Sequence, residues 1–434
     1  MGTSVKAKSR DLSEDWSGWQ ARWTLRGPAP VSSALGDTVS VSDDTTTNAF
    51  LAFAQTPLIV DPLFFALNSM QKPVRTAVII LLSIGLLALF LRGAHLDVVW
   101  TEIRHANPWL IGLSAAVTLL TMVLRAIRWQ YLLEPIGHAR FGPAFRTTTI
   151  GFAASAVLPA RAGEVIRPYL LARQEGLSAT ATFATIIIER VLDAITCVML
   201  LASFVLFFDP GMDNADRRLY WLVEVGGVMV GVLALVVLGG MYVAARDPEA
   251  AGRWAYKLEH LLPGKLTHRL AGVLLRFAEG LAVVRTPKRL ASALLLSFPL
   301  WLSIGFGIWA VTWAFGIDMP FTGSFLMIAL LVVGVSVPTP GGVGGFEAAM
   351  QIGLTSFYAV PNDRAVGTTL VLHAVSLLPT IVLGFVFVMQ DGLGFGGIRN
   401  LANAAAAPGD APTDAAPFVA AGEKAARGVG VSPE

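Results

Sequence analysis

The sequence contains little charge and a single cysteine. Only 14% of its 434 residues are charged and 54% are hydrophobic, with a mean hydropathy of +0.63, whereas a soluble domain has about 25% charged residues. Cys197 alone excludes an intrachain disulfide, and because it lies in an apolar run we expect it to be a small packing residue. The apolar runs leave no room for the alternation of a β-barrel. The composition therefore predicts an integral membrane protein built from α-helices.

Motifs typical of nucleotide-binding and metal-dependent proteins are also absent from the sequence. No G-x-x-x-x-G-K-[ST] loop occurs, so nothing indicates an ATP motor. The six histidines are scattered, and neither H-E-x-x-H nor D-x-D is present, so no metal site is predicted. The net charge of +2 says little about partners. We expect no cofactor, no nucleic-acid partner and no catalytic residue.

Six apolar runs are long enough, or nearly long enough, to span a bilayer. They cover residues 76–91, 106–124, 179–208, 219–244, 290–317 and 365–390. Basic residues concentrate in the loops 125–146 and 246–289, which we therefore place in the cytoplasm together with both termini. The second of these loops also has apolar residues at helical spacing, as in a surface helix. The acidic loop 209–224 is then expected outside.

Two further apolar segments, 146–175 and 319–362, are interrupted by proline, glycine and charge. The short run 147–158 ends at Pro159, and the second segment breaks at Pro338 and Pro340. Runs this short are typical of re-entrant helices. Given six spans, the two segments would enter the membrane from opposite sides. The sequence therefore predicts an all-α polytopic fold with about six transmembrane helices and two oppositely oriented re-entrant segments, related as an inverted repeat.

Similar residues follow the two breaks at similar distances. Glu189 comes 25 residues after Glu164, and His373 comes 26 residues after Glu347. Paired interrupted segments of this kind are the best pointer in a sequence to the midplane site of a transporter. Glycines at the breaks would let irregular backbone line such a site; they are Gly163, Gly341 and Gly344. For His373 taken alone, a packed and hydrogen-bonded histidine is the default interpretation.

The charges after the first break are costly in a bilayer, which favours a specific use for them. Arg190 and Asp193 are three residues apart and can pair, whereas Glu189 and Asp193 would repel each other. Glu189 therefore needs a further cation, and Arg161 or Arg167 is the natural partner. A helix break with such arginines could hold an anionic headgroup. The alternatives are a solvated loop with ordinary ion pairs, or an ionic network that only locks the helices together.

Three sequence motifs in this order resemble a known family. They are Arg161-Ala-Gly-Glu164-Val-Ile-Arg167-Pro-Tyr-Leu-Leu-Ala, Ile188-Glu189-Arg190-Val-Leu-Asp193 and Pro338-x-Pro340-Gly-Gly-Val-Gly-Gly-Phe-Glu347-Ala-Ala, and Arg125-Ala-x-Arg128-Trp129 also fits. Over residues 73–392 the chain resembles the lysylphosphatidylglycerol synthase transmembrane (flippase-like) family. The resemblance implies a bacterial or archaeal cytoplasmic (inner) membrane protein that moves, or helps to move, a lipid between leaflets. The soluble aminoacyl-transfer domain is missing, so lysyl-lipid synthesis is not implied. Relatives often place an arginine where this chain has His373.

These observations divide the chain into three parts. Residues 1–69 are expected to be disordered or an upstream extension, with Met70 as the true start. Residues 70–392 form the flippase-like transmembrane domain, and residues 393–434 form a disordered tail rich in alanine, proline and glycine.

The predicted function is that of a lipid translocase, not an enzyme, with a membrane phospholipid or other polar lipid as its partner. A homo-oligomer is left open. The residues expected to contact the lipid are Arg161, Glu164, Arg167, Glu189, Arg190, Asp193 and Glu347. Those expected to shape the cavity are Arg125, Arg128, Pro159, Gly163, Pro338, Pro340, Gly341, Gly344 and His373. The alternatives are an ion-coupled transporter of a small solute, and a non-catalytic subunit supporting lipid-linked sugar or aminoacyl-lipid synthesis.

Overall fold

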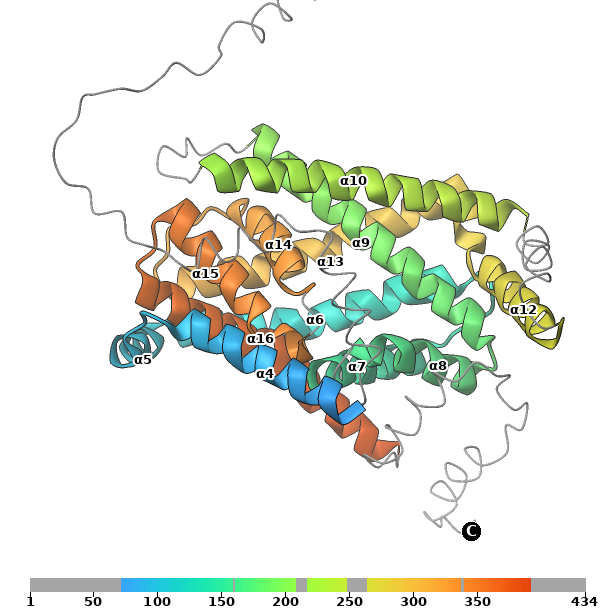
Figure 1. Ribbon diagram of the computed structural model, residues 1–434, viewed down its shortest axis with the longest axis horizontal. Coiled ribbons are helices and arrows are strands. Elements are labelled where there is room, and N and C mark those ends of the chain that lie inside the picture. Colours follow the sequence, from blue (N-terminus) through green and yellow to red (C-terminus); the bar gives the residue numbers. More distant parts are fainter. Residues whose placement is uncertain (1–71, 159–160, 208–216, 248–263, 337–338, 392–434) are drawn as a thin grey trace, which may run out of the picture. The chain divides into compact units, whose positions relative to one another are not determined.

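The computed structural model describes residues 72–158, 161–207, 217–247, 264–336 and 339–391. Over these ranges the chain forms twelve α-helices and two short 3-10 helices, without strands (Figure 1). In chain order they are α4 (Lys72–Leu91), α5 (Leu96–His105), α6 (Pro108–Leu133), α7 (Phe141–Val157), α8 (Gly163–Glu175), α9 (Ala179–Phe207), α10 (Arg217–Arg246), α12 (Gly264–Gly280), η2 (Ala282–Arg285), α13 (Pro287–Ala314), α14 (Gly323–Gly334), η3 (Pro340–Gly342), α15 (Gly345–Tyr358) and α16 (Asn362–Gln390). The predicted all-α class is confirmed.

Four helices are long and apolar enough to cross a membrane: α6, α10, α13 and α16. They match the predicted runs 106–124, 219–244, 290–317 and 365–390. Helix α9 has 29 residues, three of them charged, and is not among these four. The run 76–91 lies in α4, and the chain bends by 83° between α4 and α5, so this pair is at most one further span. The chain is a multi-pass membrane protein, and the number of six full spans stays a prediction.

The predicted end of the second span at Leu124 is wrong. Helix α6 continues to Leu133, so Arg125 and Arg128 are buried inside it and do not belong to a cytoplasmic loop. No glycine or proline follows Gly112 until Pro135, just after the helix ends, and carboxylates from α9 pair with Arg128. Arg146 likewise lies within α7. The orientation based on this loop therefore stays a prediction.

Both interrupted segments form helical hairpins. Helices α7 and α8 pack against each other around the first break, and α14 and α15 pack around the second (Figure 1). Glycines allow the close approach in each hairpin. A side chain at Gly163 would collide with the carbonyl of Gly151, and one at Gly334 would collide with the carbonyl of Gly345. Two predicted break residues, Pro159 and Pro338, lie outside the described residues, as do 1–71 and 392–434.

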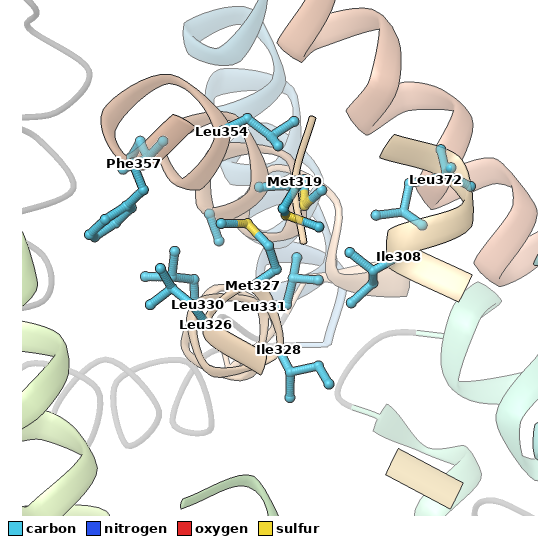
Figure 2. Packing of buried hydrophobic residues seen from close by; sticks show 14 of the residues in the cluster. Ile308, Met319, Leu326, Met327, Ile328, Leu330, Leu331, Leu354, Phe357 and Leu372 are labelled. Carbon is cyan, nitrogen blue, oxygen red and sulfur yellow. The ribbon is translucent and has the colours of Figure 1, made fainter. Parts of the chain in front are cut away.

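The second hairpin packs on a large apolar core shared with α13 and α16. Figure 2 shows Met327 and Leu331 of α14 facing this core, with Leu354 of α15, Ile308 of α13 and Leu372 of α16 around them. All five residues are buried. In contrast, α8 of the first hairpin packs on α9, which carries the charged residues. The two breaks are thus supported differently, one by an apolar core and the other by an ionic network.

Candidate functional site

The two helix breaks touch each other. The guanidinium of Arg161, in the first break, donates a hydrogen bond to the carbonyl of Val335, at the start of the second break. A Cβ atom on Gly341 would lie 3.3 Å from the carbonyl oxygen of Ala156, at the end of α7. Arg161 has a φ of 51°, a left-handed conformation that non-glycine residues seldom adopt. Such strain is typical of functional positions.

A charged cavity of about 230 Å³ lies where the breaks meet. Its ionic lining residues all come from the first hairpin and from α9: Arg161, Glu164, Arg167 and Arg190. The second break contributes Thr339 and the backbone of Gly341 and Gly342. Four of the seven residues predicted to contact the lipid are therefore together in its wall. Arg161 and Glu164 also pair with each other at 3.9 Å, with their side chains 43% and 39% exposed.

Glu189 lies behind this cavity and is completely buried. Its Oε1 atom is 3.0 Å from Arg190, 3.1 Å from Arg167 and 3.2 Å from Arg128, with Arg125 at 4.0 Å. Of the two partners predicted for Glu189, Arg167 is therefore confirmed. Arg128 is a further partner that the sequence reasoning missed, because it assigned this residue to a loop.

Asp193 joins three helices through its carboxylate. Arg128 of α6 approaches one oxygen to 2.6 Å, and the indole N–H of Trp301 on α13 donates to the same oxygen at 2.9 Å. Arg190 lies 3.6 Å from the other oxygen, which confirms the predicted pair. Arg128 also donates to Ser297 of α13 at 2.8 Å. One signal in the sequence was not used, because a tryptophan within a long apolar run needs a partner for its N–H group.

Aromatic rings hold two of the buried arginines in place. The Arg167 guanidinium lies 3.8 Å from the ring centre of Trp129, and the Arg125 guanidinium lies 4.6 Å from that of Phe152. Phe152 is also 6.0 Å from Arg167. Cation–π contacts of this kind are strongest where water is excluded. Phe152 was not predicted from the sequence, because one phenylalanine in an apolar run carries no distinguishing pattern.

The predicted residues after the second break also come together. Nδ1 of His373 lies 2.6 Å from Oε1 of Glu347, and Nε2 lies 3.0 Å from the carbonyl of Gly341. The other Glu347 oxygen accepts the backbone N–H of Gly344 at 2.6 Å, which caps α15. Gly344 has a φ of 91° and leaves no room for a side chain beside Leu86. His373 thus fastens the second break to α16.

The two halves therefore share one arrangement. In each, a residue early in the helix after the break bonds to a residue of the next long helix: Arg167 to Glu189 at 3.1 Å, and Glu347 to His373 at 2.6 Å. Glu189, Asp193 and Glu347 are buried around the charged cavity and do not line it in the described part of the chain. Their contact with a lipid stays a prediction.

A second cavity, of about 260 Å³, adjoins the first. The two share the residues Phe152, Ala156, Val335 and Leu377. Its walls come from α6, α7, α13, α14, α15 and α16 and are mostly apolar, with a few hydroxyl groups. Arg125 is the one charged residue among those that line it. Within the described ranges, no group of three or more histidine, cysteine or acidic side chains could hold a metal ion.

Comparison with known proteins places this arrangement among membrane proteins. The sequence profile of a family described as "Lysylphosphatidylglycerol synthase TM region" matches residues 76–384. The chain is 27% identical over 338 residues to a protein named "Glycosyltransferase AglD" from Haloferax volcanii, which covers 71% of this chain and 54% of that protein. This chain thus spans about half the length of that relative.

Two proteins from Methanothermobacter thermautotrophicus are also similar, and both are named "UPF0104 membrane protein". One is 22% identical over 67% of this chain and 88% of its own length. The other is 21% identical over 73% of this chain and 94% of its own length. These matches cover nearly the whole length of each relative. In those two proteins, the region similar to this chain therefore makes up most of the sequence.

Proposed function

The chain belongs to the lysylphosphatidylglycerol synthase transmembrane family, and from that premise we propose that it is a lipid translocase. The observation that carries the proposal is the contact between two helix breaks around a charged cavity. Non-helical backbone inside a membrane protein is tolerated only where it is buried or lines a cavity. Ionisable residues there mark substrate or ion pathways by default.

In the proposed mechanism, a polar or anionic headgroup enters the charged cavity while its hydrocarbon chains stay in the bilayer. Arg161 and Arg190 have side chains 43% and 38% exposed, so they can reach a ligand. Arg128 is fully buried and already bonded to Asp193 and Ser297, so its role is to hold the helices. The breaks would part to let the headgroup pass between leaflets.

Transport would be downhill or driven by an ion gradient, because the sequence contains no ATP-binding loop. Three carboxylates, Glu164, Glu189 and Glu347, are candidate proton carriers in this mechanism. Glu347 is the one best supported, because His373 lies within hydrogen-bond distance and can share a proton with it. Glu189 is the least supported, since a proton there would compete with four surrounding guanidinium groups.

A second candidate function is that of a membrane subunit supporting the synthesis of a lipid-linked sugar. The similarity to a protein named as a glycosyltransferase favours it. Against a catalytic role for this chain stands the lack of a D-x-D motif in the sequence. We propose that the chain is not itself an enzyme. A small-solute transporter is the third candidate, and it would need a cavity closed to the bilayer.

One reconstitution experiment separates these candidates. Vesicles with and without the purified protein are loaded with fluorescent lipids of several headgroups, and loss of fluorescence to a membrane-impermeant quencher is followed. The translocase proposal expects the inner-leaflet label to become accessible faster with protein. Release of a soluble solute trapped inside the vesicles, without lipid movement, would favour the small-solute transporter. Sugar transfer to a lipid phosphate by the purified chain would favour an enzyme.

A further inference from the structure

We infer that the headgroup bound at this site is a phosphate monoester with close to two negative charges, and that Arg125 is one of its ligands. The inference rests on the proposed function, because it names the substrate class of the translocase. Three observations carry it: the net charge of the ionic network, the free hydrogen-bonding capacity of Arg125, and the position of Arg125 in the apolar cavity against Phe152, which lines both cavities.

The ionic network contains more positive than negative charge. Five arginines face three carboxylates, which leaves an excess of two positive charges; the members are Arg125, Arg128, Arg161, Arg167 and Arg190 with Glu164, Glu189 and Asp193. An arginine does not lose its proton in a protein, so the excess persists. Uncompensated charge is strongly destabilising where it is buried, as it is for Arg125, Arg128 and Arg167, whereas Arg161 and Arg190 are partly exposed. A phosphate monoester carries about −1.5 to −2 at pH 7 and would compensate it.

Arg125 is the least satisfied member of this network. It forms no hydrogen bond with any described residue, and its Nε and Nη1 atoms are buried without a partner. Its nearest ionic contact is Glu189, at 4.0 Å. The residue is only 8% exposed, so bulk water does not replace the missing partners. Buried donors left unpaired are costly, and arginine binds phosphate with two parallel hydrogen bonds.

Arg125 lines the apolar cavity, and a second unpaired polar group lines the same space. The hydroxyl of Thr380 is buried without a hydrogen-bond partner, and this residue is 5% exposed. In the adjoining charged cavity the hydroxyl of Thr339 is likewise unpaired at 5% exposure. Unsatisfied donors thus lie on both sides of the residues shared by the two cavities, as expected for a ligand that occupies their junction.

Phe152 marks that junction. Its ring is in the wall of both cavities, with the Arg125 guanidinium 4.6 Å from its centre and that of Arg167 at 6.0 Å. A phosphate beside this ring would be within reach of arginines from α6 and α8. The apolar walls of the larger cavity, including Ile304, Ile328 and Leu331, suit the hydrocarbon that continues from the phosphate.

The sizes of the cavities favour a small headgroup. At about 230 and 260 Å³ they are each below the roughly 300–1,000 Å³ of typical ligand pockets. A lysylated headgroup would fit poorly for a second reason, because its ammonium groups would add to the positive excess. A lipid whose headgroup is a bare phosphate suits both the small cavity volumes and the positive excess of the network.

Binding to the purified protein tests this inference without any transport. Lipid-depleted protein in detergent is titrated with phosphatidic acid, phosphatidylglycerol, phosphatidylcholine and lysyl-phosphatidylglycerol, and binding is followed by the thermal unfolding midpoint and by native mass spectrometry. Inorganic phosphate and glycerol phosphate form the water-soluble arm. We expect phosphatidic acid to bind at least tenfold more tightly than the other lipids and than either soluble phosphate. Equal binding of all four lipids, or a preference for the cationic one, would overturn the inference.

Substitutions locate the site. Arg125→Gln should weaken the binding of phosphatidic acid by about 10- to 100-fold, which is the usual effect of a lost charge-assisted hydrogen-bond pair. Arg125→Lys keeps the charge but loses the paired geometry, and it should have an intermediate effect. Arg289→Gln removes an equal charge from an exposed pair with Glu134 and should change nothing. Wild-type affinity in both Arg125 variants would refute the role of Arg125.

The outcomes separate this inference from the proposed function. Selective phosphatidic acid binding without lipid transport supports the anion site and contradicts the translocase. Transport that is indifferent to headgroup charge supports the translocase and contradicts the anion site. Inorganic phosphate binding as tightly as the lipid would support a dianion site while excluding a lipid as its specific ligand.

Discussion

Nδ1 of His373 lies 2.6 Å from Oε1 of Glu347, and the other ring nitrogen lies 3.0 Å from the carbonyl oxygen of Gly341. A neutral imidazole has one N–H group and cannot donate to both acceptors. In its neutral form the ring therefore donates to one of these two oxygens, and in its protonated form it donates to both. Phe346 stacks on the histidine ring, with 4.2 Å between the ring centres, which fixes its orientation.

This relationship predicts that Glu347 and His373 act as one unit. Each of Glu347→Gln and His373→Asn should lower the free energy of unfolding by about 1–3 kcal/mol, because a buried charge-assisted hydrogen bond is lost. The double variant should lose clearly less than the sum of the two, since the partner is already gone. Thermal and denaturant unfolding in detergent measure this, with the exposed His105→Asn as control. Additive effects would contradict the pairing.

Arg128 is predicted to stabilise the fold and not to select the lipid. Arg128→Met removes a cation that contacts both Glu189 and Asp193, so about 3–5 kcal/mol of stability should be lost. Glu189→Gln should also destabilise, because four arginines then face one another with less compensation. Exposed Arg289→Gln should cost about 1 kcal/mol or less. Yields of folded protein by size-exclusion chromatography rank the three variants, and equal yields would refute this role.

Arg161 is predicted to matter for lipid transport and little for stability, the reverse of Arg128. Its side chain is 43% exposed, and its bond to the Val335 carbonyl links the two breaks. Arg161→Ala should therefore unfold within a few degrees of the wild type while lipid movement in vesicles falls at least tenfold. Loss of folded protein in this variant would show that the residue is structural, and normal transport would show that the link is not needed.

The hairpins could be predicted from the sequence because proline, glycine and charge interrupt apolar runs that are too short to span. The spacing from Glu164 to Glu189 nearly equals that from Glu347 to His373, which suggested a repeat, but only the second pair is in direct contact. In the first half Arg167 bonds to Glu189, and Glu164 faces the cavity. Spacing places residues on neighbouring helices, whereas rotation about the helix axis decides which of them meet.

The continuation of α6 through Arg125 and Arg128 could not be read from the chain in isolation. Two arginines after an apolar run usually mark its end at the membrane surface. Here the helix continues because Glu189 and Asp193, some 60 residues later, supply the compensating charge. The aromatic partners Trp129 and Phe152 were hidden for a similar reason, since their contacts form only when α6, α7 and α8 pack together.

Gly163 is predicted to be essential for the first hairpin. A methyl group there would collide with the Gly151 carbonyl and come within 2.7 Å of the Ser155 backbone nitrogen. Gly163→Ala should therefore lower stability by about 1–3 kcal/mol through overpacking. Gly142→Ala on the same hairpin meets no atom within 4 Å and should be neutral or slightly stabilising. Similar melting temperatures for the two variants would contradict the close approach.

The central claim is that the headgroup passes between the two breaks, and a reversible cross-link tests it most directly. A Cβ atom on Gly341 would lie 4.0 Å from the Cα atom of Ala156, so a cysteine pair at these positions is the designed cross-link. Gly341 has a φ of 63°, so the single Gly341→Cys variant controls for the strain of a side chain there. The buried Cys197 is first replaced by alanine. The reduced double-cysteine protein should move labelled lipid faster than protein-free vesicles do, oxidation should stop this movement, and reduction should restore it. Each single-cysteine variant should be insensitive to oxidation. Unchanged lipid movement in protein shown by mass spectrometry to be fully cross-linked would contradict the account.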